Sequence, residues 1–374
     1  MRLLNNNTKA FLALVRAGLW ESEARLSQFG DVDFSEVYRL ADEQSVIGLV
    51  AAGIEHVVDG KVPQEIALEF VGYALQLEQR NNAMNSFVER IYASMQKGGM
   101  YPILIKGQGI AQCYERPLWR SSGDIDLLLN GENYDHAKEW IKGIGEINEE
   151  DENDYRKRLN VKVGSWDVEL HGTLRGELGG KIDNVIDDVQ RDVFWGGNVR
   201  SWSNGNISIF LPSPDNDIIF VFTHILQHFF RGGIGLRQIC DWCRLLWTYR
   251  LDLDKKLLES RLKETSVMSE WRAFASFAVC YLGMPEKAMP FYDTQKGWKR
   301  KAGKILEFIL ETGNFGYNRD LSYKVTSSFW RRMTISLFRR TEDFIKQARI
   351  FPLDACRAYM GIWKSGLHFV FKRH

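Results

Sequence analysis

Two aspartates stand two residues apart in the segment Gly123-Asp124-Ile125-Asp126-Leu127. Residues two apart on a β-strand point to the same face, so we expect Asp124 and Asp126 to project together. Two carboxylates this close repel each other and raise each other's pKa unless a cation lies between them. Because Mg²⁺ prefers oxygen ligands, the pair is a candidate magnesium site. A solvent-facing strand end with two acids is the alternative, and a DxD alone does not decide between the two.

A glycine-containing turn precedes this pair. Lys106-Gly107-Gln108 follows a short apolar run and opens the next predicted helix. Glycine lets the backbone approach a phosphate closely, and a helix N-terminus offers free N–H groups to an anion. The lysine could add a positive charge for a triphosphate. Taken alone, the segment fits equally an ordinary strand-to-helix turn with a solvated lysine.

A second acidic segment follows the pair. In Asp167-Val168-Glu169-Leu170-His171 the alternation puts Asp167, Glu169 and His171 on one face of a strand. If this strand lies beside the strand of Asp126, Glu169 supplies a third carboxylate. Three acids on adjacent strands that face a phosphate-binding turn would form a two-metal phosphoryl-transfer site. For His171, a structural hydrogen bond and a catalytic role are both open.

The hydrophobic period predicts the elements that would position these groups. Residues 1–98 carry helical apolar stripes, with Pro63 near the start of the third helix and Gly98-Gly99 at its end. Strands are expected at residues 101–105, 125–129, 156–163, 167–170 and 207–211. Helices are expected at residues 107–114, at 134–144 and from 215 onward. The predicted fold class is α+β: a small mixed sheet over residues 99–214, flanked by helical regions at 1–98 and 215–374.

Several segments together resemble a known family. The residues that carry the resemblance are Leu104-Ile105-Lys106-Gly107, Tyr114, Pro117, Arg120, Gly123-Asp124-Ile125-Asp126-Leu127 and Val168-Glu169-Leu170-His171. They resemble the bacterial uncharacterised nucleotidyltransferase family, within the DNA polymerase β-like superfamily. The resemblance implies that Asp124, Asp126 and Glu169 are catalytic and bind Mg²⁺ or Mn²⁺. It also implies that Lys106-Gly107 occupies the place of the superfamily's Gly-Ser turn, with Gln108 where that serine would stand.

Further residues are expected around the same site. The predicted nucleotide-binding residues are Lys106, Gly107, Gln108, Arg120 and Ser122. A bracing salt bridge is the alternative role of Arg120, and turn formation is that of Ser122. The candidates for lining the cleft are His171, His224, Arg237 and Asp241. At helical i,i+4 spacing, Arg237 and Asp241 could instead pair with each other.

Two other constellations carry less weight. His224 and His228 share a helix face, but a zinc site needs a third ligand and there is no HExxH pattern. We therefore interpret them as packed or cleft-lining histidines. Cys240 and Cys243 form a CxxC within a predicted helix, without a second CxxC, and are expected to be buried small hydrophobic residues.

Composition limits the location and the partners. The five scattered cysteines do not resemble a disulfide framework, and no apolar stretch approaches the length of a membrane span, so we expect a reducing cytoplasm. A formal net charge of +1 provides no global field for nucleic acid or membrane, so neither DNA nor membrane is an expected partner. Basic and aromatic residues near 329–340 and 363–373 could touch RNA or a membrane surface, but we favour core-packing helices with solvated arginines.

Two functions follow as hypotheses. The first is a metal-dependent nucleotidyltransferase that moves a nucleoside monophosphate from a nucleoside triphosphate to a small-molecule, protein or RNA acceptor. The second is a catalytically degenerate protein of the same fold with a binding or regulatory role, nucleotide-sensing or toxin–antitoxin-like. The position of Glu169 relative to Asp124 and Asp126 discriminates between them, because the transferase needs the third carboxylate within reach of a metal.

Overall fold

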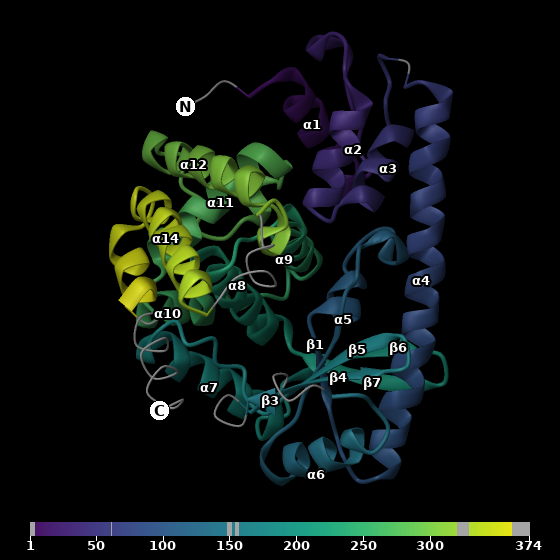
Figure 1. Ribbon diagram of the computed structural model, residues 1–374, viewed down its shortest axis with the longest axis vertical. Coiled ribbons are helices and arrows are strands. Elements are labelled where there is room, and N and C mark those ends of the chain that lie inside the picture. The colour runs from purple at the N-terminus through teal and green to yellow at the C-terminus, as the bar shows by residue number, and fades with distance from the viewer. Residues whose placement is uncertain (1–3, 61, 148–151, 154–156, 320–328, 361–374) are drawn as a thin grey trace.

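Helices come first along the chain, then a region of strands, then helices again (Figure 1). The structure, a computed structural model, describes residues 4–60, 62–147, 152–153, 157–319 and 329–360. The N-terminal helices are α1 (Asn6–Trp20), α2 (Phe34–Glu43), α3 (Ile47–Glu55) and α4 (Gln64–Lys97). As predicted, α4 begins after Pro63 and ends at Gly98.

The central sheet is mixed, which confirms the predicted fold class. Its strands are β1 (Ile103–Ile105), β2 (Ile125–Leu128), β3 (Glu152–Asn153), β4 (Arg158–Val163) and β5 (Trp166–His171). They lie in the order β1-β2-β5-β4-β3, with β2 and β5 parallel and the other neighbours antiparallel. The β4–β5 turn falls at Gly164-Ser165 as expected, and Gly164 takes a φ of 61° that glycine adopts without strain.

A two-stranded hairpin, β6 (Val199–Asn204) and β7 (Ile207–Pro212), packs beside β1 and α4. Only β7 follows from the hydrophobic pattern, because β6 is largely polar and half-exposed. The short helices of this region are α5 (Gly107–Ala111), α6 (Gly131–Lys142) and α7 (Gly180–Phe194). Of these, α5 and α6 were expected, and α7 was not.

The C-terminal part is helical, as predicted. Its helices are α8 (Pro214–Arg231), α9 (Leu236–Thr248), α10 (Lys255–Glu264), α11 (Met268–Leu282), α12 (Lys296–Thr312) and α14 (Phe329–Ala348). The 3₁₀ turns within the described residues are η1 (Ser27–Phe29), η2 (Pro117–Trp119), η5 (Glu286–Ala288) and η6 (Asn314–Gly316).

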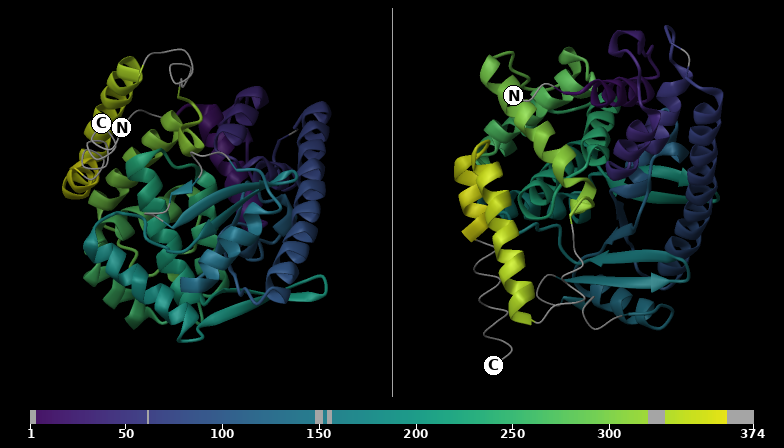
Figure 2. Two further views of the ribbon diagram at one scale, coloured as in Figure 1. Left: turned by 60° about the horizontal axis from the view of Figure 1, so that its bottom comes forward. Right: turned by 45° about the horizontal axis from the view of Figure 1, so that its top comes forward.

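Helix α4 connects two hydrophobic cores, running along one side of the molecule from α1–α3 to the sheet (Figures 1 and 2). Its first half puts Phe70 and Ala74 into a large core that joins the N-terminal helices to α8–α12. Its second half puts Met84 and Val88 into a smaller core under the sheet. The domain boundary expected near residue 98 is not tested by these contacts. The core under the sheet does include residues of α4 that precede residue 98.

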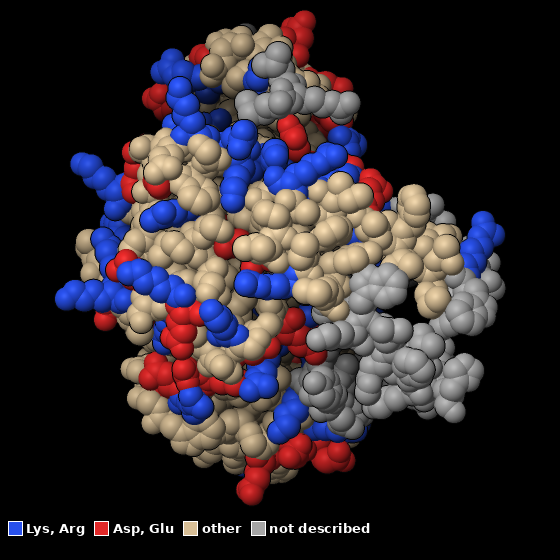
Figure 3. Space-filling view, turned by 90° about the vertical axis from the view of Figure 1, so that its left-hand side faces the viewer, with Lys and Arg blue, Asp and Glu red and all other residues tan. Residues whose placement is uncertain are grey.

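The C-terminal helix corrects one expectation. Within α14, the side chain of Phe338 is 78% exposed, so the basic and aromatic segment around it is not core-packed. Core packing resumes in the last turns of α14, where Phe344 and Ala348 contact the large core, and continues at Ile350 and Phe351. Figure 3 shows this side of the molecule, where basic side chains are interspersed with acidic ones. Residues 363–373 lie outside the described residues.

Two smaller expectations concern cysteines and membranes. Cys240 and Cys243 are both completely buried in α9 and form no disulfide, as expected for small apolar residues. Among the described residues, no helix has the length and apolar character needed to cross a bilayer.

Candidate functional site

Two carboxylates meet across the parallel strands at the centre of the sheet. Asp126 on β2 pairs in register with Glu169 on β5, and each residue is only 3% exposed. His171 follows on the same face of β5, with its Nε2 2.8 Å from Asp126 Oδ1 and 3.6 Å from Glu169 Oε2. One ligand atom from each of the three residues lies within 4.8 Å of the others. This buried group could hold a metal ion.

Asp124 lies apart from this group. Strand β2 begins at Ile125, so Asp124 precedes it and is exposed, at the edge of the cavities that adjoin the buried acids. The sequence predicts that the two carboxylates repel each other unless a cation lies near them, and at Asp126 the Lys106 ammonium is such a cation. Burial alone would raise the pKa of Asp126, but Lys106 and His171 together lower it below its ordinary value.

Cations accompany both buried carboxylates. Lys106, at the end of β1, places Nζ 2.8 Å from Asp126 Oδ1, and its backbone has a φ of 59° that non-glycine residues rarely adopt. Arg158, on β4, forms an ion pair with Glu169. The sequence analysis missed Arg158. The polar alternation of Arg158, Asn160 and Lys162 on β4 was the available signal, because Asn160 is the register partner of Glu169.

A buried polar network supports the loop that carries Asp124. The Arg120 guanidinium donates to both oxygens of Asp241, with Nε–Oδ1 and Nη2–Oδ2 distances of 2.7 Å, so Arg120 forms the kind of salt bridge that its alternative, bracing role requires. Tyr114 also donates to Asp241. The Ser122 hydroxyl accepts from Arg120 and donates to Gln108. These side chains are buried and bonded to one another.

Arg237 does not pair with Asp241, contrary to one expectation from their spacing, because Asp241 binds Arg120 instead. Arg237 Nη1 donates to the Ser121 carbonyl at 2.9 Å. No carboxylate lies within salt-bridge distance of Arg237 among the described residues, and its Nε is buried without a hydrogen-bond partner. Burial lowers the pKa of this guanidinium. It is thus a desolvated cation whose charge the described protein groups do not directly neutralise.

Two histidines of α8 lie edge-on to each other beside the site. His224 and His228 on α8 share a face as predicted, and their Nε2 atoms lie 3.0 Å apart. Burial lowers the pKa of His224 well below its ordinary value and lowers the pKa of His228 to about 3. Both rings are therefore neutral near pH 7. Neither belongs to the metal-binding group found among the described residues.

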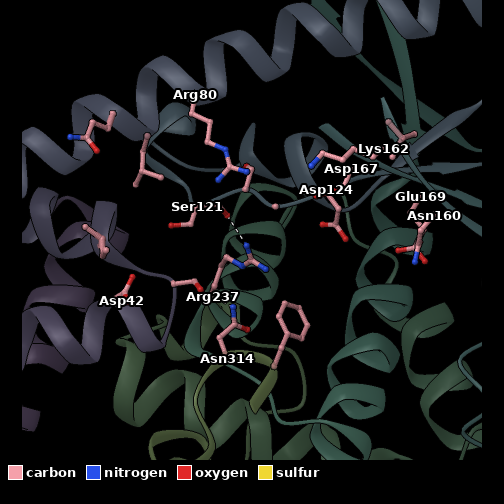
Figure 4. Close-up of a pocket in the computed structure, with 18 of the residues that line it drawn as sticks. Asp42, Arg80, Ser121, Asp124, Asn160, Lys162, Asp167, Glu169, Arg237 and Asn314 are labelled. Atoms are coloured by element: carbon pink, nitrogen blue, oxygen red, sulfur yellow. Dashed lines mark hydrogen bonds between the residues drawn. The ribbon is translucent and has the colours of Figure 1, made fainter. Parts of the chain in front are cut away.

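Two adjoining cavities expose these groups. The larger, of about 1010 Å³, is lined by residues of α4, β4, β5, α9 and η6 (Figure 4). The smaller, of about 160 Å³, reaches Lys106, Asp126, His224 and His228. The residues that line both cavities are Gly123, Asp124, Arg158, Glu169, Arg237 and Phe315. Helices from both flanking regions, α4 and α9, thus line the larger cavity.

A family match covers the carboxylates and most of the groups around them. Residues 30–283 match the family described as uncharacterised nucleotidyltransferase. No curated protein and no solved structure matches the chain. The matched span includes α2–α11, the whole central sheet and the buried group of Asp126, Glu169 and His171. On this match, which extends over most of its length, the chain belongs to the uncharacterised nucleotidyltransferase family.

Proposed function

We propose that the protein is a metal-dependent nucleotidyltransferase that transfers a nucleoside monophosphate from a nucleoside triphosphate to an acceptor. The observation that carries this proposal is the register of Asp126 with Glu169 across two parallel strands, with Asp124 at the adjoining cleft. We assign these three carboxylates to the binding of Mg²⁺ or Mn²⁺. Oxygen ligands suit both cations, and carboxylates that share one face can bridge a metal pair.

The donor set fits a divalent cation. The buried group combines two carboxylates and one imidazole, and the carboxylates can ligate while the imidazole orients one of them. Because His171 Nε2 already lies 2.8 Å from Asp126 Oδ1, we assign His171 to holding the Asp126 carboxylate in place. A bound cation would supply charge neutralisation at the phosphates.

We assign two cations of the chain to the triphosphate. Arg237 fits because it lines both cavities and has no carboxylate partner among the described residues. Lys106 fits because its ammonium lies at the Asp126 end of the smaller cavity. Arginine and lysine both bind phosphate oxygens through charge-assisted hydrogen bonds. The backbone of Gly107 also lies near Asp124, because a side chain at position 107 would approach the carbonyl oxygen of Asp124.

The remaining predicted nucleotide-binding residues suit a supporting role. Gln108, Arg120 and Ser122 are buried and use their polar atoms on one another and on Asp241. We propose that they fix the loop that carries Asp124 and do not contact the nucleotide directly. We give Asp241 the same supporting role.

The reaction balances as a single displacement. An acceptor hydroxyl attacks the α-phosphorus and gives its proton to Glu169, the bond from that phosphorus to the bridging oxygen breaks, and pyrophosphate leaves with the electron pair. Glu169 lies at the wall shared by both cavities and would position the acceptor. The larger cavity, at about 1010 Å³, reaches the upper range of small-molecule sites and has room for a triphosphate together with part of an acceptor.

One observation favours the alternative, a catalytically degenerate binding or regulatory protein. Asp126 and Glu169 each have a cationic partner within the chain, Lys106 and Arg158. If those ion pairs persist when a nucleotide is present, the carboxylates are not free to ligate a metal. Binding of a triphosphate that is independent of any divalent cation would fit this second function.

Calorimetric titration separates the two functions. ATP, GTP, CTP and UTP are titrated with Mg²⁺, with Mn²⁺ and with chelator, onto the wild type, Asp126→Asn and Asp135→Asn. Asp135 is an exposed acid on α6 and serves as the matched control. The transferase proposal expects binding that requires the cation and is lost in Asp126→Asn alone. Equal affinity in the presence of chelator would reject it in favour of the regulatory function.

Activity needs its own assay. Triphosphates labelled at the α-phosphate are incubated with Mg²⁺ or Mn²⁺ and a panel of small-molecule, protein and RNA acceptors. The proposal expects label on one acceptor class and release of pyrophosphate, both absent in Glu169→Gln. Metal-dependent triphosphate binding without transfer to any acceptor class would support the binding protein.

A further inference from the structure

An aromatic side chain at the mouth of the site is held in an unusual backbone conformation. Phe315 is the central residue of η6 and has φ 51° and ψ 25°, in the left-handed region. A bulky residue is disfavoured there and persists only where the surroundings over-determine it. The side chain is nevertheless 50% exposed, so burial of its ring does not explain the strained conformation.

The turn around Phe315 is fixed by its neighbours on both sides. Asn314 donates to the Ser45 hydroxyl at 2.7 Å and accepts from Gln238 at 2.8 Å. A side chain added at Gly235 would come within 2.7 Å of Asn314 Cβ, and one at Gly316 within 2.8 Å of the Gly232 carbonyl oxygen. These close approaches clamp the turn against the segment before α9. They leave the phenyl ring in a defined place.

That place is the junction of the two cavities. Phe315 lines both of them, together with Asp124, Glu169 and Arg237. The His228 ring meets Phe315 edge-on at a centroid distance of 4.8 Å, and the Arg237 guanidinium carbon lies 5.8 Å from the Phe315 centroid. Figure 4 shows the Arg237 and Asp124 side chains both directed into the larger cavity. The half-exposed ring of Phe315 therefore lies next to Arg237, a cation that can bind phosphate, and lines the same cavities as the acids.

We propose that Phe315 is the platform on which the nucleobase of the bound triphosphate stacks. This assignment rests on the proposed nucleotidyltransferase function and adds the binding site of the base. Every nucleobase presents a π-face, so an aromatic ring binds bases with little regard to their identity. A base on Phe315 would leave its phosphates beside Arg237 and the carboxylates. Phe315 lies outside the family match at residues 30–283, so the assignment depends on the structure alone.

The surroundings also bear on selectivity. The side-chain amide of Asn314, the polar group next to the ring, is already engaged with Ser45 and Gln238. Both of its polar atoms therefore hold the turn, which leaves the amide only one N–H and one lone pair to contact a base. We expect the four ribonucleoside triphosphates to bind within about tenfold of one another, with purines ahead because they stack over a larger area.

The test compares ligands with and without a base. ATP and inorganic triphosphate, each with Mn²⁺, are titrated by calorimetry onto the full-length wild type, Phe315→Leu, Phe315→Trp and Tyr317→Leu. Tyr317 is the matched control, an exposed aromatic residue two positions along that lines neither of the two cavities. We expect Phe315→Leu to weaken ATP binding about 10- to 100-fold and leave inorganic triphosphate unchanged. Phe315→Trp should restore ATP binding, and Tyr317→Leu should bind both ligands like the wild type.

Other outcomes overturn the assignment in distinguishable ways. If Phe315→Leu weakens both ligands equally, or neither, the base does not stack on this ring. The same conclusion follows if the wild type binds inorganic triphosphate as tightly as ATP. In these cases metal-dependent binding of a triphosphate would leave the proposed function standing. If folded wild type binds neither ligand, both proposals fail.

Discussion

Lys106 Nζ lies 2.8 Å from Asp126 Oδ1, on the side chain that we assign to the metal. The ammonium and a divalent cation would compete for the same buried carboxylate. Without metal, the lysine neutralises a group that would otherwise be an unpaired buried charge. We expect metal and nucleotide binding to release the lysine, which could then bind phosphate instead.

Replacing Lys106 with methionine should separate these two roles. We expect the metal-free Lys106→Met variant to lose about 3 kcal/mol of unfolding free energy, because Asp126 is left buried without its cation. Its affinity for Mn²⁺ should rise and its affinity for ATP with Mn²⁺ should fall. Urea denaturation measures the unfolding free energy, and calorimetry measures the affinities for Mn²⁺ and for ATP with Mn²⁺. Lys256→Met, which replaces an exposed lysine of α10, is the control. Unchanged Mn²⁺ affinity would show that Lys106 does not compete with the metal.

The histidine pair on α8 should make stability depend on pH. Burial lowers the pKa of His228 from 6.5 to about 3, so its contribution to stability is complete above pH 6.5 and is lost as the pH falls toward 3. From His228 alone we expect the unfolding free energy to fall by about 1 kcal/mol between pH 6.5 and 5.5. Urea denaturation at several pH values should show a shallower slope for His228→Gln. The exposed His136→Gln should keep the wild-type slope, and equal slopes for all three proteins would contradict the prediction.

The ion pair of Arg120 with Asp241 should matter more for folding than for nucleotide binding. Both side chains are 6% exposed, so removing one charge leaves the other buried without a partner. We expect Asp241→Asn to lower the unfolding free energy by about 3–5 kcal/mol. At a temperature where the variant is folded, its Kd for ATP with Mn²⁺ should stay within about threefold of the wild type. A stable variant with much weaker ATP binding would assign Asp241 to the ligand.

The sheet region should not fold without the second half of α4. The core under the sheet includes Met84, Val88, Ile91, Tyr92 and Met95, all from this helix. We expect a fragment of residues 99–214 to be largely unfolded by circular dichroism. A fragment of residues 80–214 should gain structure, because it restores these side chains. A stable 99–214 fragment that binds ATP would show that the proposed core domain is independent of α4.

The central sheet and its acids were predictable because short-range patterns encode them. Strict alternation in residues 166–171 and the apolar run of β2 give strand and face, and their pairing brings Asp126 to Glu169. The start of β2 at Ile125 was predicted, but the pattern did not show that Asp124, one residue before the strand, would be exposed while Asp126 is buried. Sequence alternation also cannot show which cation lies over which acid, so Arg158 was missed.

The contribution of Phe315 to the opposite wall of the cleft could not be predicted. Phe315 lies in a short turn with no motif, far along the chain from Asp124 and Glu169. Its position depends on packing between η6 and the glycine-rich segment before α9, which a single sequence does not reveal. Arg237 was named as a cleft candidate, but its pairing was mistaken because helical spacing favours Asp241. Tertiary structure supplied a better partner for that acid in Arg120.

The hydrogen bond of Asn314 to Ser45 joins residues 269 positions apart. Gln44, next to Ser45, is likewise bonded to the carbonyl of Ile309. At a synthesis rate of roughly 5–20 residues per second, the N-terminal helices wait on the order of tens of seconds before these partners leave the ribosome. During that interval the apolar faces of α1–α3 lack their C-terminal cover, a state prone to aggregation. The nascent chain should therefore depend on chaperones until the last wall of the cleft has been translated.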